Sequence, residues 1–301
     1  MRRFASLLAI LLLASFSAHR AAAQKEGDFV IKDFHFADGE TLPELRQHYL
    51  TLGAPRTDAK GLVTNAVLIM HGTTGSGRQF LSPVFAGVLY GPGQLLDTTK
   101  YYIILPDGIG HGKSSKPSDG LHARFPHYDY ADMIRAQYQM LTDGLKVNHL
   151  LIVMGTSMGG MHTWMWGEMY PDYMDGLMPL ASLPAAMSGR NRMMRRMMKD
   201  DITEDPGYDN GEYKTQPRGL AAALQLMFMM TSSPRQLQKQ YPTTAAADEY
   251  IERWQQRVLA HEDANDYLYA FEASRDYDPA PKLDRIIAPL IAVNSADDQV
   301  N

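Results

Sequence analysis

The chain has no cysteine among its 301 residues, which excludes a disulfide framework and lipid attachment to a cysteine. Positive charge is not in excess either, because the formal net charge is -5 and the isoelectric point is about 6.0. The sequence therefore lacks the basic surface that binds nucleic-acid phosphates, and nucleic acid is not an expected partner. Apolar residues make up 45% of the chain and charged residues 21%, which is sufficient for a globular core.

Long hydrophobic runs are absent except at the N-terminus. Arg2 and Arg3 precede an apolar run from Phe4 to Phe16, and three alanines follow at 21–23. This order predicts a signal peptide that is removed after Ala23, and thus an exported protein in the periplasm or outside the cell. The run is shorter than the roughly 20 apolar residues needed to cross a bilayer, so no membrane span is expected in the mature chain.

The remaining chain begins with patterns typical of strands. Aromatic and branched residues at Phe29–Phe36 and Gln47–Thr51 flank the turn Ala37-Asp38-Gly39, which predicts a hairpin at the edge of a sheet. Three short apolar runs follow, and each ends in a loop with glycine or aspartate, as buried parallel strands do. These runs are Ala66–Met70, Tyr101–Leu105 and Leu150–Met154.

Helical patterns connect these strands. Tyr130–Leu145 repeats apolar residues at helical spacing, with Asp129 or Asp132 near its start, which predicts a crossover helix. A second helix is expected at Met158–Met169, ended by Pro171, and a further strand at Gly176–Leu180. Alternating strands and helices build a mostly parallel sheet with helices on both faces, so the expected fold class is α/β.

The alternation stops at Ser182 and resumes with a last apolar run at Pro289–Val293. We expect a signal peptide at 1–23, a sheet core at 24–181, an inserted helical lid at 182–283 and a continuation of the core at 284–301. One lid helix is expected to carry methionines on one face and cations on the other. That face either packs the lid onto the core or lines a channel for an acyl chain. The methionines are Met193, Met194, Met197 and Met198, and the cations are Arg195, Arg196 and Lys199.

The third apolar strand continues directly into Gly155-Thr156-Ser157-Met158-Gly159, the G-x-S-x-G pattern of a nucleophile elbow. A sharp turn would hold Ser157 in a strained conformation, while Gly155 and Gly159 allow the strand and the helix to approach closely. A chance match in a loop would lack the strand before it and the helix after it. Ser157 is therefore the expected nucleophile.

A serine nucleophile also needs a base and N–H groups that stabilise the oxyanion. The strand Ala66–Met70 ends in His71-Gly72-Thr73-Thr74-Gly75, which would place bare backbone beside the elbow. The expected oxyanion donors are the N–H groups of Thr73 and Met158. We expect the His71 imidazole itself to be structural and bonded to neighbouring backbone.

The stretch Asp107–Ser114 contains Gly-Lys-Ser after a strand, as the phosphate-binding loop of nucleotide hydrolases does. However, Asp107 stands where that motif needs its first glycine, and no helical pattern follows. A structural turn is expected here. Neither a cofactor nor a metal ion is indicated anywhere in the sequence.

The acid and the base are expected after the last strand, in the order Ser, Asp, His. Asp298 is the expected acid, whereas Asp297 is interpreted as a helix cap or a solvated turn residue. No histidine follows Asp298. His162 is expected to point away from Ser157, and His261 lies in the lid. We therefore expect a C-terminally truncated form of a longer enzyme, without its last helices, last strand and catalytic histidine.

The chain resembles the homoserine O-acetyltransferase branch of the α/β-hydrolase superfamily. The resemblance implies a Ser-Asp-His acyl-enzyme mechanism with Ser157 as nucleophile and Asp298 as acid, acting on a small-molecule acyl ester. It is carried by Gly155–Met161 with Tyr170-Pro171-Asp172, by Phe125-Pro126, and in the lid by Asp205-Pro206, Gly211-Glu212-Tyr213 and Gly219-Leu220-Ala221.

Two features bear on the substrate. The family usually has an arginine where this chain has Leu224, so a charged amino-acid acceptor would lack a binding partner at this position. Acetyl-CoA is cytoplasmic, so an exported enzyme meets water more readily. The main hypothesis is therefore an exported, esterase-like serine hydrolase. The alternatives are an O-acyltransferase of the homoserine O-acetyltransferase type and a non-catalytic binding protein with the hydrolase fold.

Overall fold

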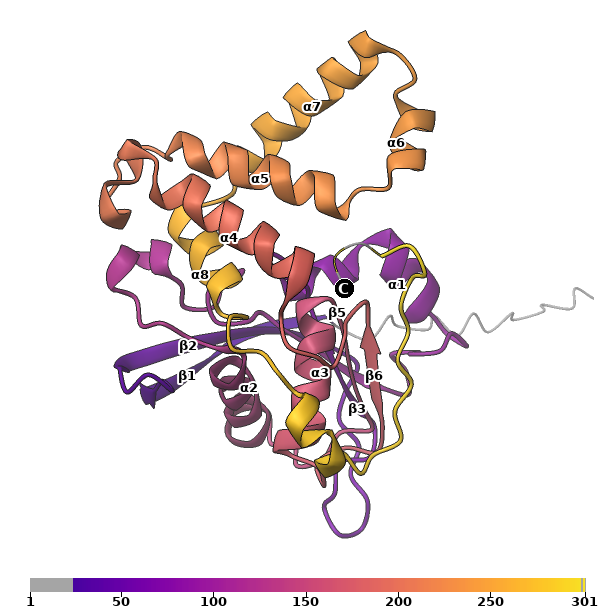
Figure 1. Cartoon of the computed structure of the whole chain (residues 1–301). Helices are drawn as coiled ribbons and strands as arrows, with labels where there is room; N and C mark the ends of the chain where they lie inside the picture. The colour runs from indigo at the N-terminus through magenta and orange to yellow at the C-terminus, as the bar shows by residue number, and fades with distance from the viewer. Residues whose placement is uncertain (1–23, 299, 301) are drawn as a thin grey trace, which may run out of the picture.

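The computed structural model describes residues 24–298 and residue 300, so the expected signal peptide lies outside the described residues. Six strands form a single sheet in the order β1-β2-β4-β3-β5-β6 (Figure 1). The strands are β1 (Lys25–His35), β2 (Thr41–Leu52), β3 (Ala66–Met70), β4 (Tyr102–Pro106), β5 (Ile152–Thr156) and β6 (Leu177–Leu180).

Strands β1 and β2 form the predicted antiparallel hairpin, and β2 pairs antiparallel with β4. The pairs β4–β3, β3–β5 and β5–β6 are all parallel. The hairpin at one edge and the mostly parallel sheet are therefore confirmed. The carboxyl ends of the four parallel strands meet at one edge of the sheet, which is where the loops that carry the predicted chemistry emerge.

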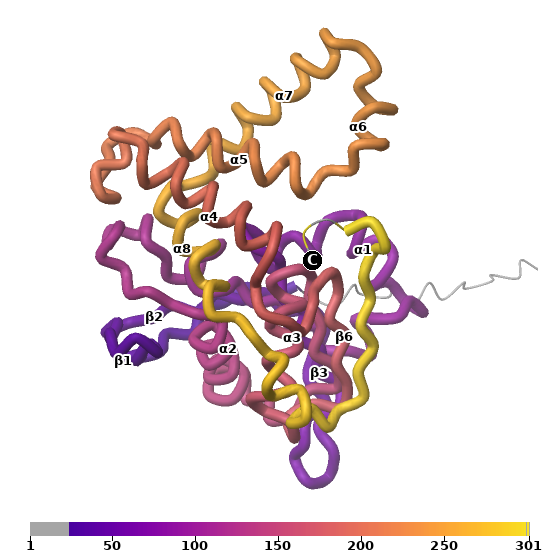
Figure 2. Tube along the Cα trace, viewed as in Figure 1, coloured from indigo at the N-terminus to yellow at the C-terminus, as the bar shows by residue number. Residues whose placement is uncertain are grey.

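The last apolar run lies beside β6 and extends the sheet. The N–H of Ile291 donates to the Leu177 carbonyl at 3.0 Å, and the N–H of Val293 donates to the Pro179 carbonyl at 3.0 Å. Two parallel bridges join the segments, one between Leu177 and Leu290 and one between Leu180 and Val293. Figure 2 shows this yellow segment running along β6, so the loop after it reaches the same carboxyl edge.

Helices cover both faces of the sheet. Strand β3 directs Leu68 and Met70 toward α2 (Tyr130–Gln139) and α3 (Met158–Met169), and directs Val67 and Ile69 toward α1 (Pro83–Leu89). This alternation explains why the run is apolar at every position, since both of its faces are buried. The seven-residue helix α1 was not expected from the sequence, because it is too short to display a helical period.

The crossover helix begins where the sequence predicts it. The N–H of Asp132 donates to Asp129 Oδ1 at 2.8 Å and the N–H of Asp129 donates to Asp132 Oδ2 at 3.1 Å, which together form a capping box. The helix ends earlier than predicted, because residues Met140–Gly144 form a π-helical turn.

Five helices lie between β6 and the last sheet segment, and in Figure 1 they sit above the carboxyl ends of the strands. They have an apolar core of their own, in which Met194, Leu220 and Tyr267 are buried. No helix in the described part of the chain is long and apolar enough to cross a membrane. The helices are α4 (Gly189–Thr203), α5 (Arg218–Thr231), α6 (Pro234–Gln240), α7 (Thr244–Leu259) and α8 (Ala264–Glu272).

The predicted methionine face of α4 is wrong. Met193 and Met197 are 64% and 57% exposed, whereas Met194 and Met198 are buried. Successive residues of a helix are rotated by about 100°, so adjacent methionines point in different directions. Arg195, predicted on the opposite face, is buried as well. The buried stripe of α4 consists of Asn191, Met194, Arg195, Met198 and Ile202.

Candidate active site

Ser157 lies between the end of β5 and the start of α3, with backbone angles φ 53° and ψ -113°. This positive φ is unfavourable for a residue with a side chain and persists only where the surroundings enforce it. The Ser157 N–H donates to the Leu180 carbonyl at 2.9 Å, and its carbonyl accepts the Met161 N–H at 2.8 Å. The sheet and the helix thus hold the strained turn from both sides, as expected of a nucleophile elbow.

The two glycines of the elbow are required by close backbone contacts. A Cβ atom on Gly155 would lie 2.4 Å from the carbonyl carbon of Gly159. A Cβ atom on Gly159 would lie 2.1 Å from the carbonyl oxygen of Met70. The predicted close approach of strand and helix is therefore confirmed.

The loop after β3 lies against the nucleophile. A Cβ atom on Gly72 would be only 3.5 Å from the Ser157 Cβ, and Thr73 is the next residue along this loop. Within the described residues, the backbone N–H groups of Thr73 and Met158 donate no hydrogen bond. The structure therefore brings three of the predicted site residues together, with two available N–H donors beside Ser157.

His71 fixes this loop in place. The N–H of Gly108 donates to His71 Nε2 at 2.9 Å, so Nε2 is unprotonated and Nδ1 donates to the Gly72 carbonyl at 2.8 Å. Burial lowers the pKa of His71 to about 4. Both ring nitrogens are occupied by backbone, which confirms the prediction that this imidazole is structural.

The Asp107–Ser114 turn is also structural. The Asp107 carboxylate accepts the N–H of Gly77 at 2.7 Å and the N–H of Lys113 at 2.8 Å. Gly112, with φ 54°, lies so close that a Cβ atom would be 2.1 Å from Asp107 Oδ2. The turn therefore links Gly77, in the segment that follows the oxyanion loop, to the end of β4.

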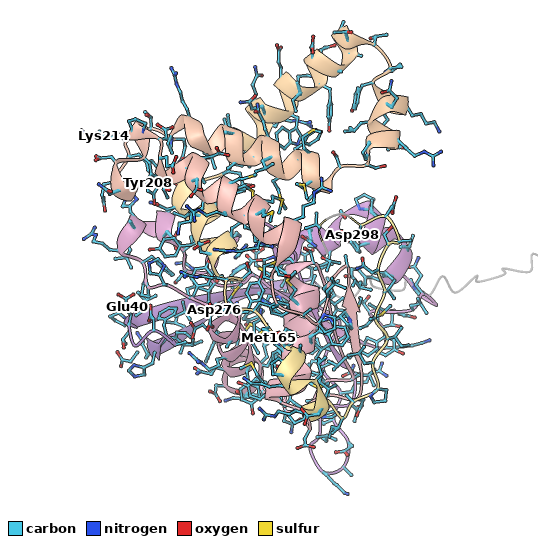
Figure 3. All side chains as sticks on the ribbon, in the orientation of Figure 1. Glu40, Met165, Tyr208, Lys214, Asp276 and Asp298 are labelled. Carbon is cyan, nitrogen blue, oxygen red and sulfur yellow. The ribbon has the colours of Figure 1, made fainter. Side chains whose placement is uncertain are left out.

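Asp298 follows the last sheet segment and is half-buried. Its Oδ1 accepts the Val300 N–H at 2.8 Å, and its own N–H donates to the Ser295 carbonyl at 3.2 Å. Figure 3 places Asp298 near α1, at the end of the sheet that faces the inserted helices. Asp297 is exposed and accepts the Ser295 hydroxyl at 2.6 Å, which lowers its pKa, so it is a solvated turn residue as predicted.

No imidazole of the described residues hydrogen-bonds to Ser157. His162 is buried on α3 with its ring edge against Tyr130, at 4.5 Å between ring centroids, and desolvation holds its pKa well below the ordinary range. His261 is exposed and lines a cleft of about 520 Å³ together with Thr74 and Gly75 of the oxyanion loop. This cleft opens between the oxyanion loop and the inserted helices.

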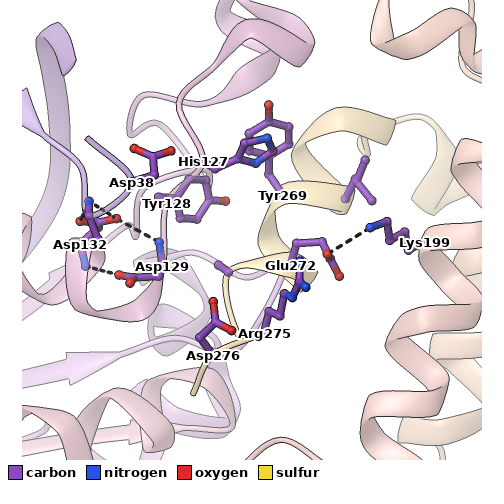
Figure 4. Close-up of a pocket in the computed structure, with 13 residues that line it drawn as sticks. Asp38, His127, Tyr128, Asp129, Asp132, Lys199, Tyr269, Glu272, Arg275 and Asp276 are labelled. Carbon is purple, nitrogen blue, oxygen red and sulfur yellow. Dashed lines mark hydrogen bonds and ion pairs between the residues drawn. The ribbon is translucent and has the colours of Figure 1, made fainter. Parts of the chain in front are cut away.

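A second cavity of about 600 Å³ lies between the start of α2, α4 and α8 (Figure 4). Its wall carries both charges, with Asp129 and Asp132 on one side and the Lys199–Glu272 ion pair on the other. Burial, and then the neighbouring Asp129 carboxylate, raise the pKa of Asp132 to about 6. Ser157 does not line this cavity, so it is separate from the elbow.

One buried charged residue of the inserted helices was missed by the sequence analysis. Arg195 is only 2% exposed, and its guanidinium donates to Asn191 Oδ1 at 2.8 Å and to the Phe271 carbonyl at 3.4 Å. No carboxylate of the described residues forms an ion pair with it, because Glu272 pairs with Arg192 and Lys199 instead. No local pattern of the sequence marks its burial, because Arg195 stands beside Arg196 and Lys199 in a stretch that has the appearance of a solvated helix face.

The strained serine between strand and helix, with the Thr73 and Met158 N–H groups beside it, is typical of the nucleophile elbow of the α/β-hydrolase class. Comparison with known proteins agrees. The "alpha/beta hydrolase fold" family matches residues 65–301. A homoserine O-acetyltransferase of Haloarcula marismortui is 30% identical, over 82% of this chain and 70% of the relative. The chain belongs to the α/β-hydrolase family, in the branch of the homoserine O-acetyltransferases.

Solved structures show the same fold. The homoserine O-acetyltransferase of Bacillus anthracis superposes with a TM-score of 0.79 at 22% identity, covering 92% of this chain and 84% of that protein. An acetylester hydrolase of Corynebacterium glutamicum superposes with a TM-score of 0.78 at 20% identity, covering 92% of this chain and 82% of that protein. At these identities the similarity establishes the fold alone. The predicted fold class is thereby confirmed.

Proposed function

We propose that the protein is a serine O-acyltransferase that carries an acyl group on Ser157 and passes it to a hydroxyl acceptor. The observation that carries this proposal is the strained Ser157 backbone, with the Met158 N–H directly after it and the loop that carries the Thr73 N–H against it. Such a turn costs free energy and is retained where it aims a nucleophile. The N–H groups of Thr73 and Met158 are the proposed oxyanion donors.

In the first half-reaction, Ser157 Oγ forms a bond to the acyl carbon while an imidazole accepts the hydroxyl proton. The carbonyl oxygen becomes negative and is stabilised by the two N–H groups. The bond to the leaving group then breaks, and the leaving group takes the proton. In the second half-reaction, the acceptor hydroxyl loses its proton to the imidazole and attacks the acyl carbon. The bond between Ser157 Oγ and the acyl carbon then breaks, and the imidazole returns the proton to Ser157 Oγ.

Asp298 is the proposed acid that orients this imidazole, since it follows the last parallel segment at the carboxyl edge of the sheet. None of the described histidines hydrogen-bonds to Ser157, and the ring nitrogens of the buried His162 have no hydrogen-bond partner among the described residues.

Transfer is preferred to hydrolysis because relatives that are 30% and 31% identical to this chain, from Haloarcula marismortui and Pelobacter propionicus, are homoserine O-acetyltransferases. This reverses the order of the two hypotheses drawn from the sequence. Hydrolysis remains the second candidate, and Leu224 favours it, because the family's usual arginine is absent at this position. Both functions share the acyl-enzyme on Ser157.

The test uses p-nitrophenyl acetate as acyl donor, with and without homoserine, and Ser157→Ala as control. We expect intact-protein mass spectrometry to detect one acetyl group on Ser157 and product analysis to detect O-acetylhomoserine. Acetylation of Ser157 with acetate as the sole product would favour the hydrolase. No acetylation above the Ser157→Ala control would contradict both and favour a non-catalytic binding protein.

A further inference from the structure

The cleft between the oxyanion loop and the inserted helices is lined by a buried histidine that lacks a partner. The cleft has a volume of about 520 Å³, and His111 of the turn after β4 is one of its lining residues. His111 is only 3% exposed, and its Nε2 has no hydrogen-bond partner among the described residues. Nδ1 bonds to the Ile109 carbonyl at 2.8 Å and therefore carries the proton, so Nε2 can only accept a hydrogen bond. Burial lowers the pKa of His111 to about 3, which keeps the ring neutral.

A second buried group without a partner lies beside the same turn. The Tyr128 hydroxyl is buried and has no hydrogen-bond partner within the part of the chain that the structure describes. A Cβ atom on Gly110 would be 1.8 Å from this hydroxyl, and Gly110 lines the cleft. Buried polar groups without partners are unfavourable, and native structures retain few of them. The two groups therefore indicate a place where a ligand supplies the missing hydrogen bonds.

The wall formed by the inserted helices carries a carboxylate without a partner. Glu262, two residues before α8, is partly buried, and burial followed by the Asp266 charge raises its pKa. The lysine and the arginine that line the cleft are engaged elsewhere, since Lys116 pairs with Asp266 at 3.2 Å and Arg78 pairs with Glu26 at 2.6 Å. The Glu262 carboxylate itself forms neither a hydrogen bond nor an ion pair with the described residues. A cation beside it would offset the desolvation of its charge.

These groups determine the charge and the donors that a ligand needs. An anion would be repelled, because Glu262, Asp263 and Asp266 all line the cleft. A neutral alcohol can donate to His111 Nε2 but leaves Glu262 without a counter-charge. A primary ammonium group supplies both a positive charge and three N–H donors, whereas a quaternary ammonium group has no donor.

We propose that this cleft binds an aliphatic diamine, with one ammonium group at Glu262 and the other donating to His111 Nε2. The volume of the cleft is sufficient for such a small molecule. Ser157 does not line the cleft, so the diamine is not the acyl acceptor and the inference does not depend on the proposed function.

The site is connected to the oxyanion loop through its own lining. Thr74 and Gly75 line the cleft and directly follow Thr73, whose N–H is a proposed oxyanion donor. A diamine bound between this loop and the residues before α8 would hold the two segments together. The cleft is therefore an effector site, whose occupant restricts the motion of the oxyanion loop.

The experiment measures binding to the 301-residue protein by isothermal titration calorimetry, with three ligands of equal carbon-chain length. The first is 1,4-diaminobutane. The second is its fully N-methylated bis-quaternary derivative, which keeps both charges but has no N–H donor. The third is 1,4-butanediol, which keeps the donors but has no charge. The variants are Glu262→Gln and His111→Phe, and Glu252→Gln is the matched control because it removes the same charge from an exposed position of α7 outside the cleft.

We expect saturable binding of 1,4-diaminobutane, with the quaternary derivative and the diol each weaker by roughly 10-fold or more. Glu262→Gln should weaken diamine binding by roughly 10- to 100-fold, as for loss of a charge-assisted hydrogen bond, and His111→Phe by about 3- to 10-fold. Glu252→Gln should bind the diamine as the wild type does. Hydrogen exchange of residues 72–79 and 261–267 should slow when the diamine binds to the wild type.

Equal binding of the diamine and its quaternary derivative would show attraction to the net negative charge of the protein and would overturn the proposal. Diamine binding that is unchanged in Glu262→Gln, or no saturable binding at millimolar concentration, would overturn it as well. Binding without slower exchange at 72–79 would place the ligand away from the oxyanion loop. Circular dichroism reports whether each variant is folded, and the ligand series with Glu262→Gln decides the outcome if His111→Phe is not. None of these measurements requires acylation of Ser157, so failure of the proposed function is recognised separately.

Discussion

Gly159 lies so close to Met70 that a Cβ atom on the glycine would be 2.1 Å from the carbonyl oxygen of Met70. Met70 is the last residue of β3, and the oxyanion loop begins directly after it. Gly159 is the second residue of α3, which begins directly after Ser157. This contact therefore holds the start of α3, next to Ser157, against the start of the loop that carries Thr73.

Replacing Gly159 with alanine should separate β3 from α3, because the methyl group has no space. We expect a loss of about 2–4 kcal/mol in the free energy of unfolding, typical of overpacking against rigid backbone, and a loss of Ser157 acylation. Urea unfolding and intact-protein mass spectrometry measure the two effects. Gly87→Ala on α1 is the matched control, since a Cβ atom there meets nothing within 4 Å. Equal stability of the two variants would refute the argument.

The elbow and the sheet could be predicted from the sequence because their signals are local. Gly155 and Gly159 flank the serine at fixed spacing, and each buried strand is a short continuous apolar run. The structural roles of His71 and Asp107 were also predictable, since each stands in a turn that must satisfy its own backbone.

Arg195 could not be found in the same way. An arginine beside Arg196 and Lys199 has the sequence appearance of a solvated helix face, and only tertiary packing decides which of them is buried. Reading α4 as one methionine face obscured the 3- and 4-residue spacing of its buried stripe.

Glu168 should make the stability of the protein depend on pH. Its side chain is buried on α3, and desolvation raises its pKa to about 7 against 4.5 for an ordinary glutamate, although Lys282 and Arg285 oppose the shift. Because the folded state holds the proton more tightly than the unfolded state, this contribution is complete below pH 4.5. It is lost as the pH rises through about 7.

Glu168→Gln should therefore be more stable than the wild type at pH 8, by about 1–3 kcal/mol, and nearly equal to it at pH 4.5. Urea unfolding at the two pH values measures the difference. Glu252→Gln, on the exposed side of α7, is the control and should change the free energy of unfolding only slightly at both pH values. A Glu168→Gln variant that is less stable at pH 8 would show that the ionised carboxylate has a stabilising partner.

Export is a prediction from the sequence alone. If the N-terminal residues are a signal peptide removed after Ala23, the mature protein should begin at Gln24. N-terminal sequencing of the protein from its native host tests this, with Ala23→Asp as a variant that should slow cleavage because the cleavage site requires a small residue. Recovery of Met1 on most of the protein would contradict the prediction.

The final prediction concerns the base. None of the described histidines hydrogen-bonds to Ser157, so its hydroxyl should react slowly even though the elbow and the oxyanion donors are in place. Free imidazole added to the solution can take over the proton, as an external base does when a catalytic side chain is missing. We expect added imidazole to accelerate acetylation of Ser157 in the 301-residue chain in proportion to its concentration.

Rescue must be measured against the reaction of imidazole with the ester itself, and Ser157→Ala provides that background. Without imidazole, the remaining oxyanion donors should still support a residual rate above that of water, by roughly 10³–10⁴-fold in comparable serine enzymes. His261→Ala and His162→Ala test whether either of these histidines serves as the base. We expect neither variant to change the rate of Ser157 acetylation or its acceleration by imidazole. Rapid acetylation without imidazole that disappears in His261→Ala would mean that the cleft between the oxyanion loop and the inserted helices closes to deliver this histidine. In that case the base would be His261 of the inserted helices, and not a histidine that follows the acid in the order Ser, Asp, His.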